Sequence, residues 1–318
     1  MSNKTIAKFS SLVIFVVCGW MLASACSHAS SSSRSALNSS EASPDWQKPV
    51  VVGRIASADV RESSGLADSP CQPNVFWTHN DNGDEAFIFA MTPTGKHLGT
   101  WRVAGARNDD WEDMAAYKAP DGTCSLYIGD IGNNKLERPD LRVYRVREPV
   151  VSDATATSNE KNPLQTEAAE MASFKYSDTP HNAETLMVQP QTADVYVLTK
   201  RLDGPSLVFK FKPQFGSATP ETAQKIAEVA MPAVPNGLLT GGAISPDGKR
   251  VILCDYSSGY ELILGDSVNF DEIWKSRPVP VDLSDRKQGE AVTFSPDGRS
   301  IFATSEKKNA EIVEVRRR

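Results

Sequence analysis

The sequence predicts an all-β fold, and three observations support this prediction. Short β-branched and aromatic runs alternate with Gly, Pro, Asp and Asn throughout residues 44 to 318, as strands and turns do. A helical period is found only at residues 222 to 229. The stretch GEAVTFSPDGRSIFATSE, at residues 289 to 306, has an imperfect twin in GGAISPDGKRVILCDYSS, at residues 241 to 258. Repeats of short paired strands are typical of β-propellers.

Each copy of the repeat has a small or acidic residue, an apolar strand, a turn, a second apolar strand and a polar cluster. The five copies begin at Ser64, Glu112, Glu184, Thr240 and Glu290. Four-stranded blades need about 40 to 50 residues each, so we expect five blades, with six as the alternative. The longest spacing, after Glu112, accommodates strands at residues 141 to 146 and 170 to 177 and a polar loop at residues 148 to 165.

The ring is expected to close between the two ends of this domain. After the last copy only residues 311 to 317 remain for a further strand, so the last blade lacks one outer strand. Residues 48 to 56, which precede the first copy, form an apolar run that we expect to supply it.

The first 25 residues are expected to be an export signal. Lys4 and Lys8 precede an apolar run at residues 12 to 23, which is long enough for a signal sequence but short for a spanning helix. The run ends in LASAC, which resembles the lipobox of bacterial lipoproteins and implies lipidation of Cys26. Ordinary cleavage nearby and a retained membrane anchor are the alternatives.

The residues after the signal indicate location and tethering. Ser27 follows Cys26, and the lipoprotein sorting rule then implies the outer membrane, with the protein facing the periplasm or the cell surface. Residues 26 to 43 are Ser-rich with almost no large apolar side chain, so we expect a disordered tether. The propeller domain would then comprise residues 44 to 318.

The charge of the chain bears on its partners, and its cysteines bear on disulfide formation. The net charge is −6 and no large basic cluster occurs, which argues against nucleic acid as a partner. Export implies an oxidising compartment, and Cys71 and Cys124 fall in the same turn of adjacent blades, so we expect a disulfide between them. Cys254, inside an apolar strand, is expected to be a buried thiol.

First-strand starts and second-strand ends converge at one mouth of a propeller channel. Like charges gathered there need a cation, and Ca²⁺ prefers oxygen ligands. The expected metal-binding or ligand-binding residues are Glu112, Glu184, Glu290, Asn80, Asp81 and Asp255. Two alternatives remain for the three glutamates: structural hydrogen bonds to backbone amides of the neighbouring blade, or catalysis.

Several motifs resemble those of secreted bacterial propellers of the phytase-like and gluconolactonase-like kind, which are related to NHL and WD40 repeats. They are SGL, WEDMA with LYIGDIGNN, AETL with VYVLTK, SPDG, and GEAV with ATSE, and they span residues 61 to 306. The resemblance implies a divalent metal at the channel mouth. The lactonase-like ligands are Glu, Asn and Asp, whereas the equivalent positions here are Ser64, Glu112, Glu184, Thr240 and Glu290.

We therefore expect a cell-envelope binding module for a small molecule, a glycan or a protein, held at the membrane by its lipid anchor. The alternative is a Ca²⁺-dependent hydrolase, phytase-like or lactonase-like, with His79 or Asp130 as the catalytic base. The chain has no nucleophile-elbow, zinc-protease or P-loop motif. An assembly scaffold is a third possibility.

Overall fold

Short strands and tight turns build nearly all of the chain that can be described, which confirms the all-β prediction. The computed structural model describes residues 45–232 and 238–318. The expected signal sequence, Cys26 and the Ser-rich tether lie outside these residues. Within them, no helix combines the length and apolar character needed to cross a membrane.

The strands form four sheets in which neighbours in sequence mostly pair antiparallel. The first sheet contains, in order, β2 (Gly65–Asp68), β3 (Phe76–His79), β4 (Phe87–Met91), β5 (His97–Arg102) and β9 (Leu164–Gln165). The second contains β6 (Trp111–Lys118), β7 (Cys124–Asp130), β8 (Arg142–Arg147), β10 (Glu170–Tyr176), β14 (Glu221–Val229), β13 (Ser206–Phe211), β12 (Val195–Thr199) and β11 (Ala183–Val188). The third contains β15 (Gly241–Ile244), β16 (Arg250–Cys254), β17 (Gly259–Ile263) and β18 (Val279–Val281). The fourth contains β19 (Gly289–Phe294), β20 (Ser300–Ser305), β21 (Glu311–Arg316) and β1 (Val50–Arg54).

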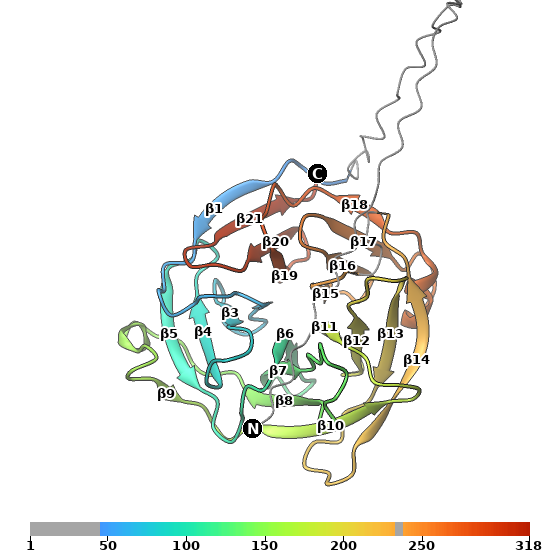
Figure 1. Cartoon of the computed structure of the whole chain (residues 1–318). Coiled ribbons are helices and arrows are strands. Elements are labelled where there is room, and N and C mark those ends of the chain that lie inside the picture. Colours follow the sequence, from blue (N-terminus) through green and yellow to red (C-terminus); the bar gives the residue numbers. More distant parts are fainter. Residues whose placement is uncertain (1–44, 233–237) are drawn as a thin grey trace, which may run out of the picture. The chain divides into compact units, whose positions relative to one another are not determined.

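The sheets are arranged in a propeller-like way, with the first strand of each repeat innermost (Figure 1). The five inner strands are β2, β6, β11, β15 and β19; each contacts the next, and β19 contacts β2. The eight-stranded sheet consists of two four-stranded groups, joined by parallel pairing of β10 with β14. β1 pairs antiparallel with β21, so an N-terminal strand completes the last sheet.

Apolar side chains pack between the faces of neighbouring four-stranded groups. Trp77 and Trp101 from the first sheet pack with Trp111 and Ile128 from β6 and β7. Between the last and first sheets, Phe302 meets the ring edge of Phe76, with ring centroids 4.8 Å apart. Burial of one such side chain contributes about 1.5 to 3 kcal/mol. The packing fixes the inner strands and therefore the residues at their ends.

The SPDG turns of the twin stretches have a structural role. Gly248 and Gly298 adopt φ values of +67° and +66°, a backbone conformation that favours glycine. Arg250 donates a hydrogen bond of 2.8 Å to the carbonyl of Gly298 and so links the two turns.

Two segments differ from the sequence prediction. Residues 222 to 229, with their helical period, belong to β14, an outer strand that is exposed along most of its length and so lacks a two-residue alternation. The expected loop at residues 148 to 165 contains a short 3-10 helix, η1 (Thr155–Thr157), and ends in β9, which pairs in parallel with β5. A second 3-10 helix, η2 (Phe270–Lys275), packs against Tyr196.

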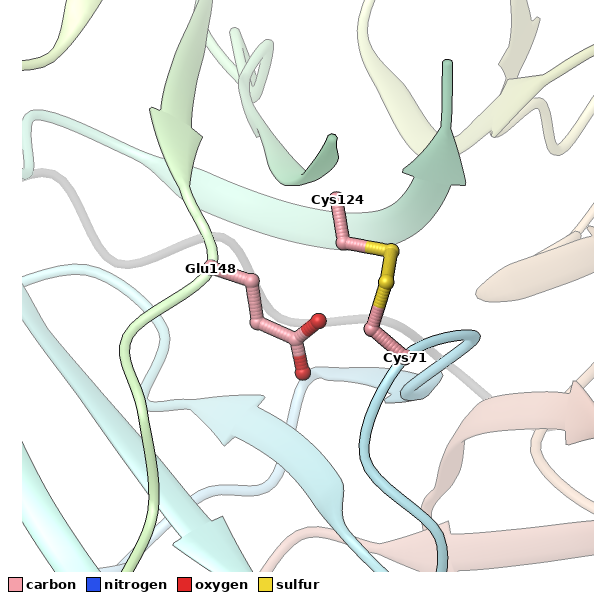
Figure 2. A group of neighbouring side chains, drawn as sticks. All are labelled: Cys71, Cys124 and Glu148. Atoms are coloured by element: carbon pink, nitrogen blue, oxygen red, sulfur yellow. A yellow bond between two sulfur atoms is a disulfide. The ribbon is translucent and has the colours of Figure 1, made fainter. Parts of the chain in front are cut away.

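The disulfide between Cys71 and Cys124 is confirmed, and it joins the β2–β3 turn to the start of β7. Glu148 lies beside it (Figure 2) and accepts hydrogen bonds from Trp77 Nε1 at 2.8 Å and Gln72 Nε2 at 2.9 Å. Cys254 is the expected buried free thiol, and burial raises its pKa to about 12.

Candidate functional site: an acidic channel mouth

The residues that begin the five repeats all lie at the starts of inner strands. Glu112, Glu184 and Glu290 are 3 to 5% exposed, and Ser64 and Thr240 are also buried. Because the inner strands run in the same direction around the channel, these five positions gather at one mouth. The sequence analysis expected the starts of the inner strands to meet at one mouth of the channel.

Small polar side chains, rather than the glutamates, tie neighbouring inner strands together. Ser64 donates to the carbonyl of Glu112 at 2.5 Å, and Thr240 donates to the carbonyl of Gly289 at 2.8 Å. Asp113 accepts the amide hydrogen bonds of Leu186 at 3.0 Å and Gly242 at 3.3 Å, and so bridges β6, β11 and β15. No described residue donates a backbone amide to any of the three glutamate carboxylates. The alternative role of the glutamates, to accept hydrogen bonds from backbone amides of the neighbouring blade, is therefore not supported among the described residues.

Asp81, Asp110 and Glu112 form a carboxylate triad. One oxygen of each lies within 4.8 Å of the others. Oδ1 of Asp81 is buried and has no hydrogen-bond partner in the described part of the chain. Carboxylates that share a small volume in this way repel each other unless a proton or a cation is present.

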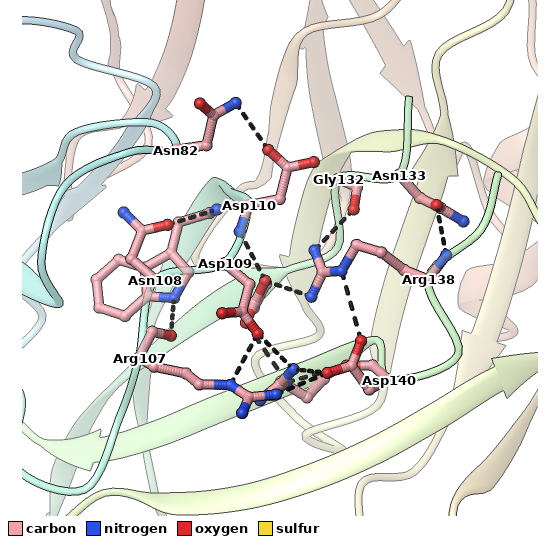
Figure 3. Close-up of polar contacts among 12 residues, drawn as sticks. Asn82, Arg107, Asn108, Asp109, Asp110, Gly132, Asn133, Arg138 and Asp140 are labelled. Carbon is pink, nitrogen blue, oxygen red and sulfur yellow. Dashed lines mark hydrogen bonds and ion pairs between the residues drawn. The ribbon is translucent and has the colours of Figure 1, made fainter. Parts of the chain in front are cut away.

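Gly132 has no side chain at the place where the carboxylates of Glu112 and Asp110 lie. A β-carbon on this residue would stand 2.1 Å from Glu112 Oε1 and 2.4 Å from Asp110 Oδ2, closer than real side chains approach. Asn82 donates a hydrogen bond of 2.9 Å to the carboxylate of Asp110 (Figure 3). The backbone amide of Asp110 donates to the carboxylate of Asp130 at 3.0 Å. The absence of a side chain at Gly132 thus allows the carboxylates of Glu112 and Asp110 to lie against the backbone.

A second group at the mouth centres on Lys200. Its ammonium contacts Glu184 at 2.5 Å and the hydroxyl of Tyr256 at 2.6 Å. The pKa of Glu290 is raised well above its usual value, first by burial and then by the charge of Glu184. Lys200 therefore offsets part of the negative charge, and its own pKa is raised by Glu184 despite burial.

The negative charges of the two groups act on each other. Burial, followed by the charges of Glu184 and Asp81, raises the pKa of Glu112 well above its usual range. Burial raises the pKa of Asp81 to about 7, with a further contribution from Asp110. Ionisation of these carboxylates is therefore unfavourable in the free protein, and a bound cation would stabilise their ionised form.

Two expected ligands are occupied by hydrogen bonds. Asn80 accepts amide hydrogen bonds from Arg61 at 2.8 Å and Glu62 at 3.1 Å. Asp255 accepts from the amides of Ser257 and Ser258 and, at 2.7 Å, from Tyr260. Asp255 therefore holds a local turn, as short Asp side chains often do. Asn80 instead joins the end of β3 to the segment that precedes β2.

The two expected bases are fully buried. His79 donates from Nδ1 to the carbonyl of Asn80 at 2.9 Å and packs against Trp111, and burial lowers its pKa to about 4. Asp130 pairs with Arg138 at 2.7 Å. Burial raises the pKa of Asp130, and Arg138 opposes this. Neither side chain is exposed to a substrate.

Asp110 and Asp113 were not among the residues expected from the sequence. Asp110 precedes the repeat that Glu112 begins, and Asp113 follows Glu112 inside an apolar strand. The acidic run NDDWED at residues 108 to 113 was the available signal.

No family model and no curated protein sequence matches the chain. Its fold is similar to that of a gluconolactonase from Xanthomonas campestris, at 12% identity, with 86% of this chain and 95% of that chain covered and a TM-score of 0.44. A soluble aldose sugar dehydrogenase from Escherichia coli, in the apo form, is similar at 12% identity, 85% and 99% coverage and a TM-score of 0.43. A chain of a nidogen/laminin complex gives 13% identity, 78% and 73% coverage and a TM-score of 0.43. The chain thus resembles gluconolactonase-like propellers among others, at a distance that carries no inference on activity.

Proposed function

We propose that this chain is a five-bladed β-propeller whose acidic mouth binds one Ca²⁺ ion and serves as a binding module for a small molecule, a glycan or a protein. The closed series of contacts among five inner strands, with β1 paired to β21, supports the blade count and the closure of the ring. The carboxylate triad carries the metal proposal, because one oxygen of each acid lies within 4.8 Å of the others and Gly132 leaves room for two of the carboxylates.

The donor set fits a hard cation. Ca²⁺ takes six to eight oxygen ligands, so Asp81, Asp110 and Glu112 would fill only part of its shell. The remaining positions are available to water and to oxygen atoms of a bound ligand. A bound cation would also offset the two effects that raise the pKa values of Glu112 and Asp81, first burial and then repulsion between carboxylates.

A Ca²⁺-dependent hydrolase is the second candidate, because the ligand positions that three carboxylates would leave free on the ion could accept a substrate oxygen. The phytase-like form has less support, since phosphate binding needs free cationic groups and Lys200 is already paired with Glu184 and Tyr256. The lactonase-like form needs a base other than His79 or Asp130, since both are fully buried.

We also propose that the chain is exported and anchored in the cell envelope, at the outer membrane, by a lipid on Cys26. The signal-like and lipobox-like residues 1 to 26 support this proposal. Cells fed labelled palmitate should label the wild-type chain but not the Cys26→Ser chain. Labelling of both chains, or of neither, would contradict the anchor.

Thermal unfolding in EDTA, followed by titration with Ca²⁺, tests the metal site. A ligand at 100 times its Kd stabilises a protein by about 2.7 kcal/mol, and each 1 kcal/mol raises the Tm of a domain this large by about 2 to 4 °C. We expect a rise of about 5 °C or more, abolished in Glu112→Gln and retained in Glu167→Gln, which alters an exposed carboxylate far from the triad in sequence. No rise in the wild type would refute the metal site. A screen of lactones and esters in Ca²⁺ then separates a hydrolase from a binding module.

A further inference from the structure

A cavity lies at the end of the channel opposite the carboxylate triad. It has a volume of about 420 Å³ and is lined by all five inner strands, through Leu66, Met114, Met187, Ile244 and Phe294. β6 carries Glu112 near its start and Lys118, which lines this cavity, at its end. The cavity and the carboxylate triad therefore open on opposite faces, and the inference below does not depend on the metal site.

The wall of this cavity is mainly apolar. Prolines from four turns, Pro70, Pro190, Pro246 and Pro296, form part of its rim. Apolar walls hold water poorly, and cavities of this size with a few polar groups are typical sites for small molecules. The space therefore favours a ligand with an apolar body.

Asp68, the last residue of β2, supplies a carboxyl group at this cavity. It has no ion pair with a described residue, and the charges that act on it, Glu148 and Asp297, are negative. Burial and these two charges raise its pKa to about 8. Lys118 also lines the cavity, but this residue is exposed, so its ammonium can remain in water. A carboxyl without a counter-charge in an apolar space is complementary to a cation.

We propose that this cavity binds a small apolar molecule that carries one protonated amine, with the ammonium beside Asp68 and the apolar body along the ends of the inner strands. The apolar wall supplies affinity by burial, and Asp68 selects for the positive charge. A neutral molecule of the same shape gains only the first of these contributions.

The test uses 4-phenylbutylamine and its neutral analogue 4-phenylbutanol, with the full-length protein labelled at the methionine ¹³C methyl groups. Met114 and Met187 line the cavity, whereas Met91 and Met171 lie in other strands and serve as internal controls. We expect the amine to shift the Met114 and Met187 resonances selectively and to bind at least about tenfold more tightly than the alcohol.

The charge dependence is tested with Asp68→Asn, which keeps the shape of the side chain. The preference for the amine should disappear in this variant and persist in Asp266→Asn, a change at an exposed site. Equal binding of amine and alcohol to the wild type, or shifts that spare Met114 and Met187, would overturn the proposal. The wild-type comparison decides the matter even if Asp68→Asn fails to fold, which its methionine spectrum would reveal.

Discussion

Gly132 lies so close to Glu112 that a β-carbon would stand 2.1 Å from Glu112 Oε1. The nearest obstacles are the carboxylate ends of Glu112 and Asp110, which can turn away, rather than backbone atoms. A methyl group at this position would therefore displace the carboxylates of Glu112 and Asp110 without disrupting the strands.

Gly132→Ala should abolish the Ca²⁺-induced rise in Tm while the far-ultraviolet circular dichroism remains that of the wild type. Gly204→Ala is the matched control, because its β-carbon would meet only Arg201, at an ordinary distance of 3.6 Å. Thermal unfolding with and without Ca²⁺ measures both variants. A full Ca²⁺ response in Gly132→Ala would place the ion outside the triad.

The metal-free protein should lose stability as the pH rises from 7 to 9. The pKa of Asp68 is raised to about 8 in the folded protein, whereas a carboxyl in the unfolded chain ionises near pH 4. The folded state then binds more protons than the unfolded state, so the free energy of unfolding falls as the pH rises toward 8 and levels off above it. His79, with its pKa lowered to about 4, is almost entirely neutral in both states over this range and contributes little.

Urea unfolding in EDTA at pH 7, 8 and 9 measures this loss. Asp68→Asn removes the titrating group, so its stability should fall by about 1 kcal/mol less than that of the wild type over the same range. Identical slopes for the two proteins would show that Asp68 ionises normally.

Loss of the disulfide should destabilise the protein by about 4 kcal/mol. Cys71 and Cys124 are separated by 53 residues, and closure of a loop of that length restricts the unfolded chain by about this amount. Urea unfolding of Cys71→Ser/Cys124→Ser, compared with Cys254→Ala as a cysteine control outside the bridge, gives the difference. Equal stability of the double variant and the wild type would contradict a stabilising role.

Trp46 attaches the start of the described chain to the third sheet. Its indole Nε1 donates to Glu261 Oε2 at 2.9 Å, and Glu261 is fully buried. Trp46→Phe leaves this carboxylate without that donor and should cost about 1 to 3 kcal/mol more than Trp274→Phe. Trp274 is a suitable control because its indole nitrogen has no hydrogen-bond partner among the described residues. Equal losses in urea unfolding would assign the whole effect of Trp46 to packing.

The positions of the strands and of the mouth could be predicted because they depend on periodic features of the chain. The repeat gives the direction of each inner strand, and this alone brings Glu112, Glu184 and Glu290 to one mouth. The disulfide followed from equivalent turn positions of Cys71 and Cys124. The parallel pairing of β9 with β5 was missed, because a two-residue strand in a polar loop has no period to detect.

The choice of partners at the mouth could not be predicted, because it depends on side-chain distances of a few ångströms. Asp255 has a carboxylate that could bind a metal, but this group accepts hydrogen bonds from the backbone amides two and three residues further on. Asp110 joins the triad through a loop that lies outside the repeat, and Lys200 takes Glu184 into an ion pair. Sequence spacing indicates which residues approach each other but not which atoms meet.

Isothermal titration of the EDTA-treated, dialysed protein with Ca²⁺ tests the central claim most directly. The proposed site predicts one Ca²⁺ ion per chain for the wild type, and binding weakened at least tenfold in Asp110→Asn and Glu112→Gln, since each change removes a carboxylate ligand from the triad. Glu167→Gln should bind as the wild type does. Absence of Ca²⁺ binding to the wild type at millimolar concentrations, or unchanged binding in both triad variants, would contradict the account.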